Sequence, residues 1–171
     1  MRPYAIVLML FVSLVALLWC TPDVKNDLVE IKVPSQAELV KRGAYLVTIG
    51  VCDDCHSPKI FGPNGPEVDS TRRLSGHPRE EPIPKITDPG MVKPGEWVLF
   101  GPMFTATAGE WGVSFSANLT PDDTGIGNWD FKQFEKAIRE GKSKGMDGTR
   151  SLLPPKTWFN FAQMSDEDLQ A

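Results

Sequence analysis

The feature that most constrains this chain is the five-residue segment Cys52-Asp53-Asp54-Cys55-His56. Two cysteines separated by two residues and followed at once by a histidine form the pattern that attaches a c-type haem. Each thiol can bond one vinyl group of the porphyrin, and the adjacent imidazole can bind the iron as its proximal ligand. The segment therefore predicts one covalently bound haem c, held by Cys52 and Cys55 with His56 on the iron.

Two other chemistries also use closely spaced cysteines. A thioredoxin-like redox pair needs a thiolate stabilised by positive charge or by a helix N-terminus. Here Asp53 and Asp54 lie between the thiols, and the helix expected before them presents its C-terminal end. A structural zinc site takes four Cys or His ligands, and outside the motif the chain has only Cys20 and His77 to offer. Haem attachment is favoured, with the redox pair and zinc as alternatives.

The N-terminus has the pattern of an export signal. Arg2 precedes an apolar run over residues 4–19, which ends abruptly at Cys20 and a polar segment. Residues 17–20 resemble a lipoprotein cleavage box, in which Cys20 would become the lipidated N-terminus. The run, at about 17 residues, is also long enough to act as an uncleaved membrane helix. Both possibilities predict a signal or anchor over residues 1–20, a tether over 21–34, and a domain on the periplasmic side of a bacterial membrane.

Length and charge narrow the function further. The chain has 171 residues, which leaves room for one domain after the signal. Its 41% hydrophobic and 23% charged residues are typical of a globular protein. With 18 basic against 22 acidic residues, the net charge is -4, which argues against nucleic acid as a partner and favours basic or neutral protein partners.

Helix signals occur at both ends of the remaining sequence, residues 35–171. Ser35 with a glutamate three residues on is a capping box, and an apolar periodicity follows it as far as Gly50. A second helix is expected from Asp130, as N-cap, to a stop at Gly141. A third opens at Ser165 and is cut off at the last residue, which suggests that the chain is truncated at its C-terminus.

Between these helices the sequence predicts mostly loop. Residues 57–102 include nine prolines and show little helical periodicity. A loop this long is expected to pack on a large ligand, and a haem would supply the apolar surface. Residues 97–100 and 111–115 are the only segments in this part of the chain that suggest short strands.

Several further segments, together with the motif, carry a family resemblance: residues 74–78 (Leu-Ser-Gly-His-Pro), 116–122 (Ser-Ala-Asn-Leu-Thr-Pro-Asp), 124–127 (Thr-Gly-Ile-Gly) and Trp129. The sequence resembles class I cytochrome c domains of the membrane-associated, dehydrogenase-linked bacterial type over nearly all of residues 35–171. The resemblance implies an all-α fold, with few helices and long loops around one haem. It also implies electron transfer without catalysis by the domain itself, with subunits of a dehydrogenase or respiratory complex as redox partners.

One position departs from that family. The family has Leu-Pro-Pro-Met-Pro-Trp after its second helix, and the Met is the sixth iron ligand, whereas residues 153–158 here read Leu-Pro-Pro-Lys-Thr-Trp. The distal ligand could be Lys156, which stands where the Met is expected, or else Met146 or His77. An open distal site is the remaining alternative, and it would favour a haem enzyme or a sensor of peroxide or a diatomic gas.

Overall fold

The computed structural model describes residues 33–171. The chain divides into two units, Met1–Val33 and Pro34–Ala171. The predicted signal or anchor with Cys20 lies outside the described residues, as does almost all of the predicted tether. Within the part that is described, no helix is long and apolar enough to cross a membrane.

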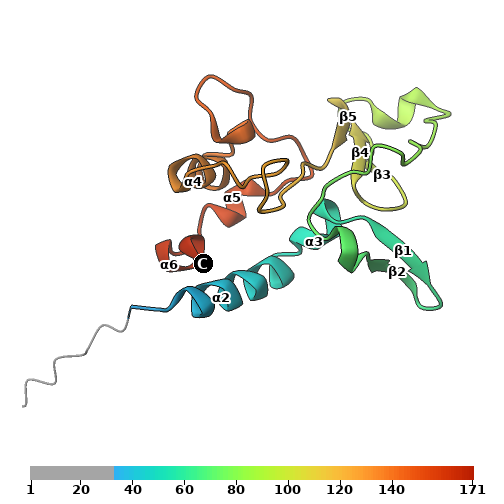
Figure 1. Ribbon diagram of the computed structural model, residues 1–171. Helices are drawn as coiled ribbons and strands as arrows, with labels where there is room; N and C mark the ends of the chain where they lie inside the picture. The colour runs from blue at the N-terminus through green and yellow to red at the C-terminus, as the bar shows by residue number, and fades with distance from the viewer. Residues whose placement is uncertain (1–32) are drawn as a thin grey trace, which may run out of the picture. The chain divides into compact units, whose positions relative to one another are not determined.

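Helix α2 (Gln36–Ile49) begins with the predicted capping box. The Ser35 hydroxyl accepts a hydrogen bond from the Glu38 N–H at 3.3 Å, and the Glu38 carboxylate accepts one from the Ser35 N–H at 2.8 Å. The helix ends at Gly50, and Val51, with a left-handed φ of 51°, turns the chain into α3 (Cys52–His56). Helix α2 therefore leads directly into the cysteine motif, as the sequence predicts (Figure 1).

The prediction of an all-α fold is wrong. The described residues include five short strands in two antiparallel sheets alongside the helices. The first sheet is a hairpin of β1 (Lys59–Gly62) and β2 (Gly65–Val68), which pairs Ile60 with Glu67. It lies in the segment that we expected to be loop. Its two strands have four residues each and are joined by a two-residue turn. Such short strands pair through their backbone, and a search for helical periodicity does not detect them.

The second sheet has the order β3-β4-β5, with β3 at Leu99–Phe100, β4 at Ala106–Gly109 and β5 at Gly112–Phe115. Strands β3 and β5 fall within the two segments that suggested strands. Strand β4, in the middle, is buried along its whole length. Its small side chains fit a central position in the sheet. The strand has none of the large branched or aromatic residues that normally indicate a strand in a sequence.

Three helices make up the C-terminal part: α4 (Phe131–Arg139), α5 (Trp158–Phe161) and α6 (Asp166–Gln170). Helices α4 and α6 begin at the predicted caps Asp130 and Ser165. Helix α6 lies beside α2 (Figure 1), where Arg42 and Asp168 form an ion pair at 2.8 Å. The described chain also has short 3-10 helices at η1 (Ser70–Arg72), η2 (Pro89–Val92) and η3 (Ser143–Gly145).

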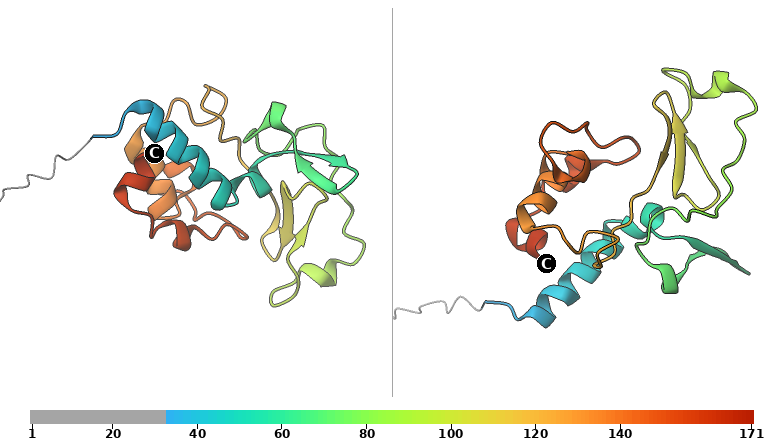
Figure 2. Two further views of the ribbon diagram at one scale, coloured as in Figure 1. Left: turned by 90° about the horizontal axis from the view of Figure 1, so that it is seen from below. Right: turned by 45° about the horizontal axis from the view of Figure 1, so that its top comes forward.

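The polypeptide buries few large apolar side chains of its own. The buried hydrophobic residues among those described are Ala106, Ala108, Ala137 and Leu169. Many large apolar side chains instead remain substantially exposed, Val51 at 59% and Phe159 at 57% among them. In Figures 1 and 2, α3 lies between the helices α4–α6 and the two sheets, so the cysteine motif occupies the middle of this unit.

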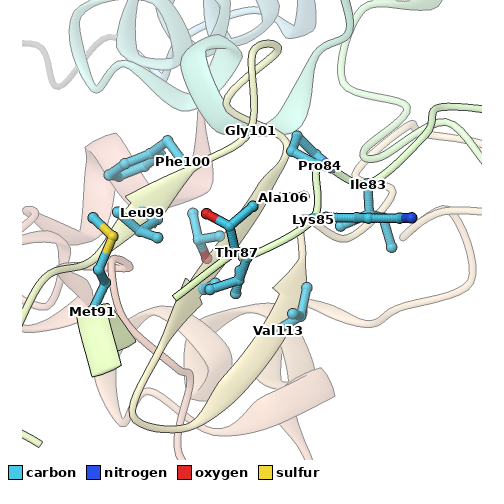
Figure 3. Close-up of a pocket in the computed structure, with 13 residues that line it drawn as sticks. Ile83, Pro84, Lys85, Thr87, Met91, Leu99, Phe100, Gly101, Ala106 and Val113 are labelled. Atoms are coloured by element: carbon cyan, nitrogen blue, oxygen red, sulfur yellow. The ribbon is translucent and has the colours of Figure 1, made fainter. Parts of the chain in front are cut away.

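A separate groove of about 240 Å³ lies against the second sheet. Figure 3 shows Leu99, Phe100 and Val113 from the sheet together with Met91 and the segment around Pro84. None of the predicted site residues lines this groove. It therefore belongs to the sheet region and not to the cysteine motif.

Candidate haem site

The two motif cysteines are free thiols, and both are half-buried. Cys52 and Cys55 are three residues apart on α3, so both side chains lie on one side of the helix. Burial raises the pKa of both thiols, and the nearby Lys156 ammonium opposes that rise. A pair of protonated, unbridged thiols on one helical face suits thioether formation with two vinyl groups.

The imidazole of His56 is held in one orientation. Its Nδ1 lies 2.8 Å from the carbonyl oxygen of Ala117. A carbonyl oxygen can only accept, so Nδ1 carries the proton and Nε2 keeps the lone pair that can bind a metal. Burial lowers the pKa of His56, the hydrogen bond to Ala117 opposes that shift, and the Lys156 ammonium adds to it. The neutral imidazole, which is the form that binds iron, is therefore favoured.

Backbone hydrogen bonds of Gly76 and His77 connect the end of the motif to the segment around Ala117. The Gly76 N–H donates to the His56 carbonyl at 2.7 Å, and the His77 N–H donates to the Ser116 carbonyl at 3.0 Å. Gly76 has a φ of 77°, and a Cβ placed on it would lie 2.6 Å from the Ala117 carbonyl carbon. Only glycine allows this close approach, which brings the acceptor for His56 against the motif.

Asp53, inside the motif, anchors it to the same segment. Its carboxylate accepts hydrogen bonds from the Arg73 guanidinium at 2.7 to 3.0 Å and from the Ser57 hydroxyl at 2.8 Å. The Ser57 hydroxyl in turn accepts a bond from the Leu74 N–H at 2.8 Å. Burial raises the pKa of Asp53, but these hydrogen bonds outweigh it and hold the pKa below its ordinary value. The sequence alone gives no indication that Arg73 and Ser57 support the motif.

The structure brings Lys156 to the motif. Its side chain is half-buried, and its ammonium acts electrostatically on Cys52, Cys55 and His56. Its Nζ lies 4.2 Å from the centre of the Phe161 ring. A Cβ placed on Gly50 would meet Phe161 at 3.3 Å and the Cys52 sulfur at 3.6 Å. Lys156 and Phe161 thus lie beside the thiols. Burial lowers the pKa of Lys156, although the two cysteines oppose that shift.

The other two distal candidates are placed differently. Met146 is 51% exposed and follows η3, which packs against α4. The ring of His77 is 2.9 Å from the Thr105 hydroxyl and packs on Phe115 with ring centres 4.8 Å apart. Met146 is thus open to solvent, and the His77 ring is held by Thr105 and Phe115.

The described residues fit a haem. Covalent attachment requires two free thiols, which Cys52 and Cys55 provide. The two axial positions require two donors, and these would be the His56 imidazole, oriented by a carbonyl, and the Lys156 amine near the same thiols. Ile49 and Val51, next to the motif, are 56% and 59% exposed and would be available to pack on a porphyrin. Within residues 33–171, no group of three or more His, Cys, Asp and Glu side chains is arranged to hold a metal ion.

Comparison with known proteins finds components of dehydrogenases. The chain is 31% identical over 134 residues to the cytochrome c subunit of gluconate 2-dehydrogenase from Pantoea cypripedii, a match that covers 78% of this chain and 21% of the relative. It is 28% identical over 138 residues to the cytochrome c subunit of alcohol dehydrogenase (quinone) from Gluconacetobacter polyoxogenes, covering 80% and 21% respectively.

A shorter stretch of 61 residues is 41% identical to the cytochrome c subunit of alcohol dehydrogenase (quinone) from Gluconobacter oxydans, covering 35% of this chain and 12% of the relative. The chain spans about a fifth of the length of the two cytochrome c subunits that it matches over most of its own length. No family model matches the chain, and no solved structure does so.

Proposed function

We propose that this chain is a monohaem c-type cytochrome domain of the class I type. It carries single electrons between redox protein partners at the outer face of a bacterial membrane. The observation that carries the proposal is the fixed His56 imidazole, with Nδ1 donating to Ala117, directly beside two free thiols. The similarity to cytochrome c subunits of dehydrogenases supports an electron carrier in a dehydrogenase complex.

Each part of the site has its own task. Cys52 and Cys55 hold the porphyrin edge, and His56 binds the iron through Nε2. The Ala117 carbonyl fixes the tautomer of His56 and strengthens it as a ligand. Bound haem supplies one-electron redox chemistry, while the protein sets its potential and access. No step of substrate chemistry is assigned to the domain.

Lys156 is the proposed distal ligand. It stands where the family that the sequence resembles has Met, and its ammonium acts electrostatically on Cys52, Cys55 and His56. A lysine amine must be neutral to bind a metal, and burial favours the neutral form. The rival function, a haem enzyme or gas sensor, requires instead that Lys156 stay away from the iron and leave its distal face open.

The proposed location rests on the N-terminal segment. The apolar run over residues 4–19 and Cys20 suit either a lipid anchor or a membrane helix, and haem attachment takes place outside the cytoplasm. We therefore propose the periplasmic side of a bacterial membrane, with dehydrogenase or respiratory complex subunits as partners.

The direct test is covalent attachment. The full chain, expressed together with a haem-attachment system, should keep peroxidase staining on a denaturing gel. Cys55→Ala should weaken that stain and Cys20→Ala should not, because Cys20 lies outside the motif. If the Cys55→Ala protein stains like the wild type, Cys55 does not form a thioether with the haem. Cyanide and carbon monoxide should leave the spectrum unchanged, whereas an immediate change would favour the enzyme or sensor.

A further inference from the structure

Lys59 is the only charged side chain among the described residues that is buried, with 6% of its surface exposed. It follows the cysteine motif by three residues and begins β1. Its Nζ donates to the carbonyl oxygens of Asp53 and Asp54 at 2.9 Å each and to that of Ser57 at 2.5 Å. A buried lysine is costly unless its charge is compensated, so this placement needs a reason.

The three carbonyls belong to the end of the motif helix. Asp53 and Asp54 lie within α3, and Ser57 caps its C-terminus. The Asp53 carbonyl also accepts the Ser57 N–H at 3.1 Å, and a cation at this end of a helix is favoured by the partial negative charge of the last carbonyls. Lys59 thus closes α3 at its C-terminal end and folds the chain back directly after His56.

The geometry also requires the charged form of Lys59. An ammonium has three N–H donors, and all three point at acceptors that can only accept. A neutral amine would have two donors and would place a lone pair against a carbonyl. Burial lowers the pKa of Lys59, while Asp54, Cys55 and Asp53 oppose that shift.

No carboxylate in the described chain pairs with this charge. The ion pairs formed by the described residues do not include Lys59, and the carboxylate of its neighbour Asp53 is taken by Arg73. Three neutral carbonyls contact the ammonium directly, and the carboxylates of Asp54 and Asp53 act on it only through space. Lys59 therefore places a positive charge without a directly bound counter-ion at the end of α3, in a buried region where charges act strongly.

We propose that Lys59 is a positioning residue that raises the reduction potential of the iron centre and fixes the end of α3 that presents His56. Reduction of ferric to ferrous iron adds one electron, and a fixed positive charge nearby favours the state with that electron. The inference rests on the proposed haem function. It adds a determinant of potential that is not an iron ligand.

The test compares neutral and charged variants of the haem-loaded full chain. Lys59→Met removes the charge and keeps the length of the side chain, Lys59→Gln keeps two donors without the charge, and Lys59→Arg keeps the charge. Lys93→Met is the matched control, because Lys93 is exposed and its loss changes the net charge by the same amount. The readouts are the midpoint potential, from a spectroelectrochemical titration, and the haem content per chain.

The potential of Lys59→Met or Lys59→Gln should shift to more negative values than those of the wild type and Lys93→Met. An unchanged potential in a haem-loaded neutral variant would overturn the proposal. If neither neutral variant retains haem, Lys59→Arg decides: haem content and potential near the wild type support a role for the charge, and failure to recover haem rejects it. A wild-type chain without covalent haem would instead refute the proposed function.

Discussion

The ammonium nitrogen of Lys156 lies 4.2 Å from the centre of the Phe161 ring, in a cation–π contact. This contact favours the protonated lysine, whereas binding to iron requires the neutral amine. The same side chain is therefore placed between two partners that compete for it. Phe161 holds Lys156 beside the thiols, where the amine would serve as the proposed distal ligand.

Replacement of Lys156 by methionine should raise the reduction potential. A thioether stabilises ferrous iron, so a Met-ligated haem has a higher potential than one bound by a nitrogen base. Lys156→Met should also introduce the far-red sulfur-to-iron absorption band. The exposed residue Lys132 on α4 provides the control, since Lys132→Met should change neither property. A wild-type spectrum that already contains the band would assign the iron to a methionine such as Met146.

Gly76→Ala should destabilise the protein more than Gly95→Ala. Both glycines have positive φ, 77° and 84°, but an added Cβ meets backbone at 2.6 Å at Gly76 and nothing within 4 Å at Gly95. The left-handed conformation costs alanine about 1–2 kcal/mol at either site, and Gly76 adds the displacement of Ala117. Urea unfolding of both variants measures the difference. Equal decreases in the free energy of unfolding would show that the backbone at Ala117 can move away from an added Cβ at no cost.

Asp53→Asn should lower the free energy of unfolding at neutral pH by about 1–3 kcal/mol, because it weakens hydrogen bonds to a charged, largely buried acceptor. The Asp53 side chain is 15% exposed. Its native pKa lies below the ordinary value, so its contribution is complete above about pH 5 and is lost as the pH falls through the native pKa.

The difference between the wild type and Asp53→Asn should accordingly be constant from about pH 5 to 8 and shrink toward pH 3. Unfolding in urea at pH 7 and pH 3 tests this dependence. Asp123 is exposed, and Asp123→Asn should have little effect at either pH. A difference that persists unchanged at pH 3 would mean that Asp53 acts through packing and not through its charge.

Cys20→Ala should separate the two proposed anchors. If the chain is a lipoprotein, the variant loses its lipid label or passes into the soluble fraction, because the lipid on Cys20 would be the anchor. If the apolar run stays as a membrane helix, the variant remains bound. Fractionation with metabolic lipid labelling measures both. A wild-type protein without label that stays on the membrane excludes lipidation.

The starts of α2, α4 and α6 were predictable because their signals are local. Ser35 and Glu38 lie within one turn and satisfy each other's backbone, and Asp130 and Ser165 cap their helices with side-chain oxygens. Strand β4 gave no such signal. Its sequence, Ala-Thr-Ala-Gly, becomes a central strand only because β3 and β5 pair with it on both sides.

The cysteine motif could be recognised in the sequence, but the residues that hold it in place could not. Arg73 is 20 residues from Asp53, and nothing in the order of residues indicates that the two side chains meet. Ala117 contributes a backbone carbonyl, which any residue would supply, so its side chain gives no clue. Lys59 has the apolar neighbours Pro58 and Ile60 in the sequence, which is a weak signal, and its burial is visible only in the structure. The motif residues themselves remain predictions until haem is measured.

The hydrogen bond from His56 to Ala117 spans 61 residues of sequence. A ribosome adds about 5–20 residues per second, so the motif is made about 3–12 s before its acceptor. During that interval the His56 imidazole has no Ala117 carbonyl to donate to. The orientation of the imidazole is therefore set late, when the backbone around Ala117 has been made and packs behind the motif.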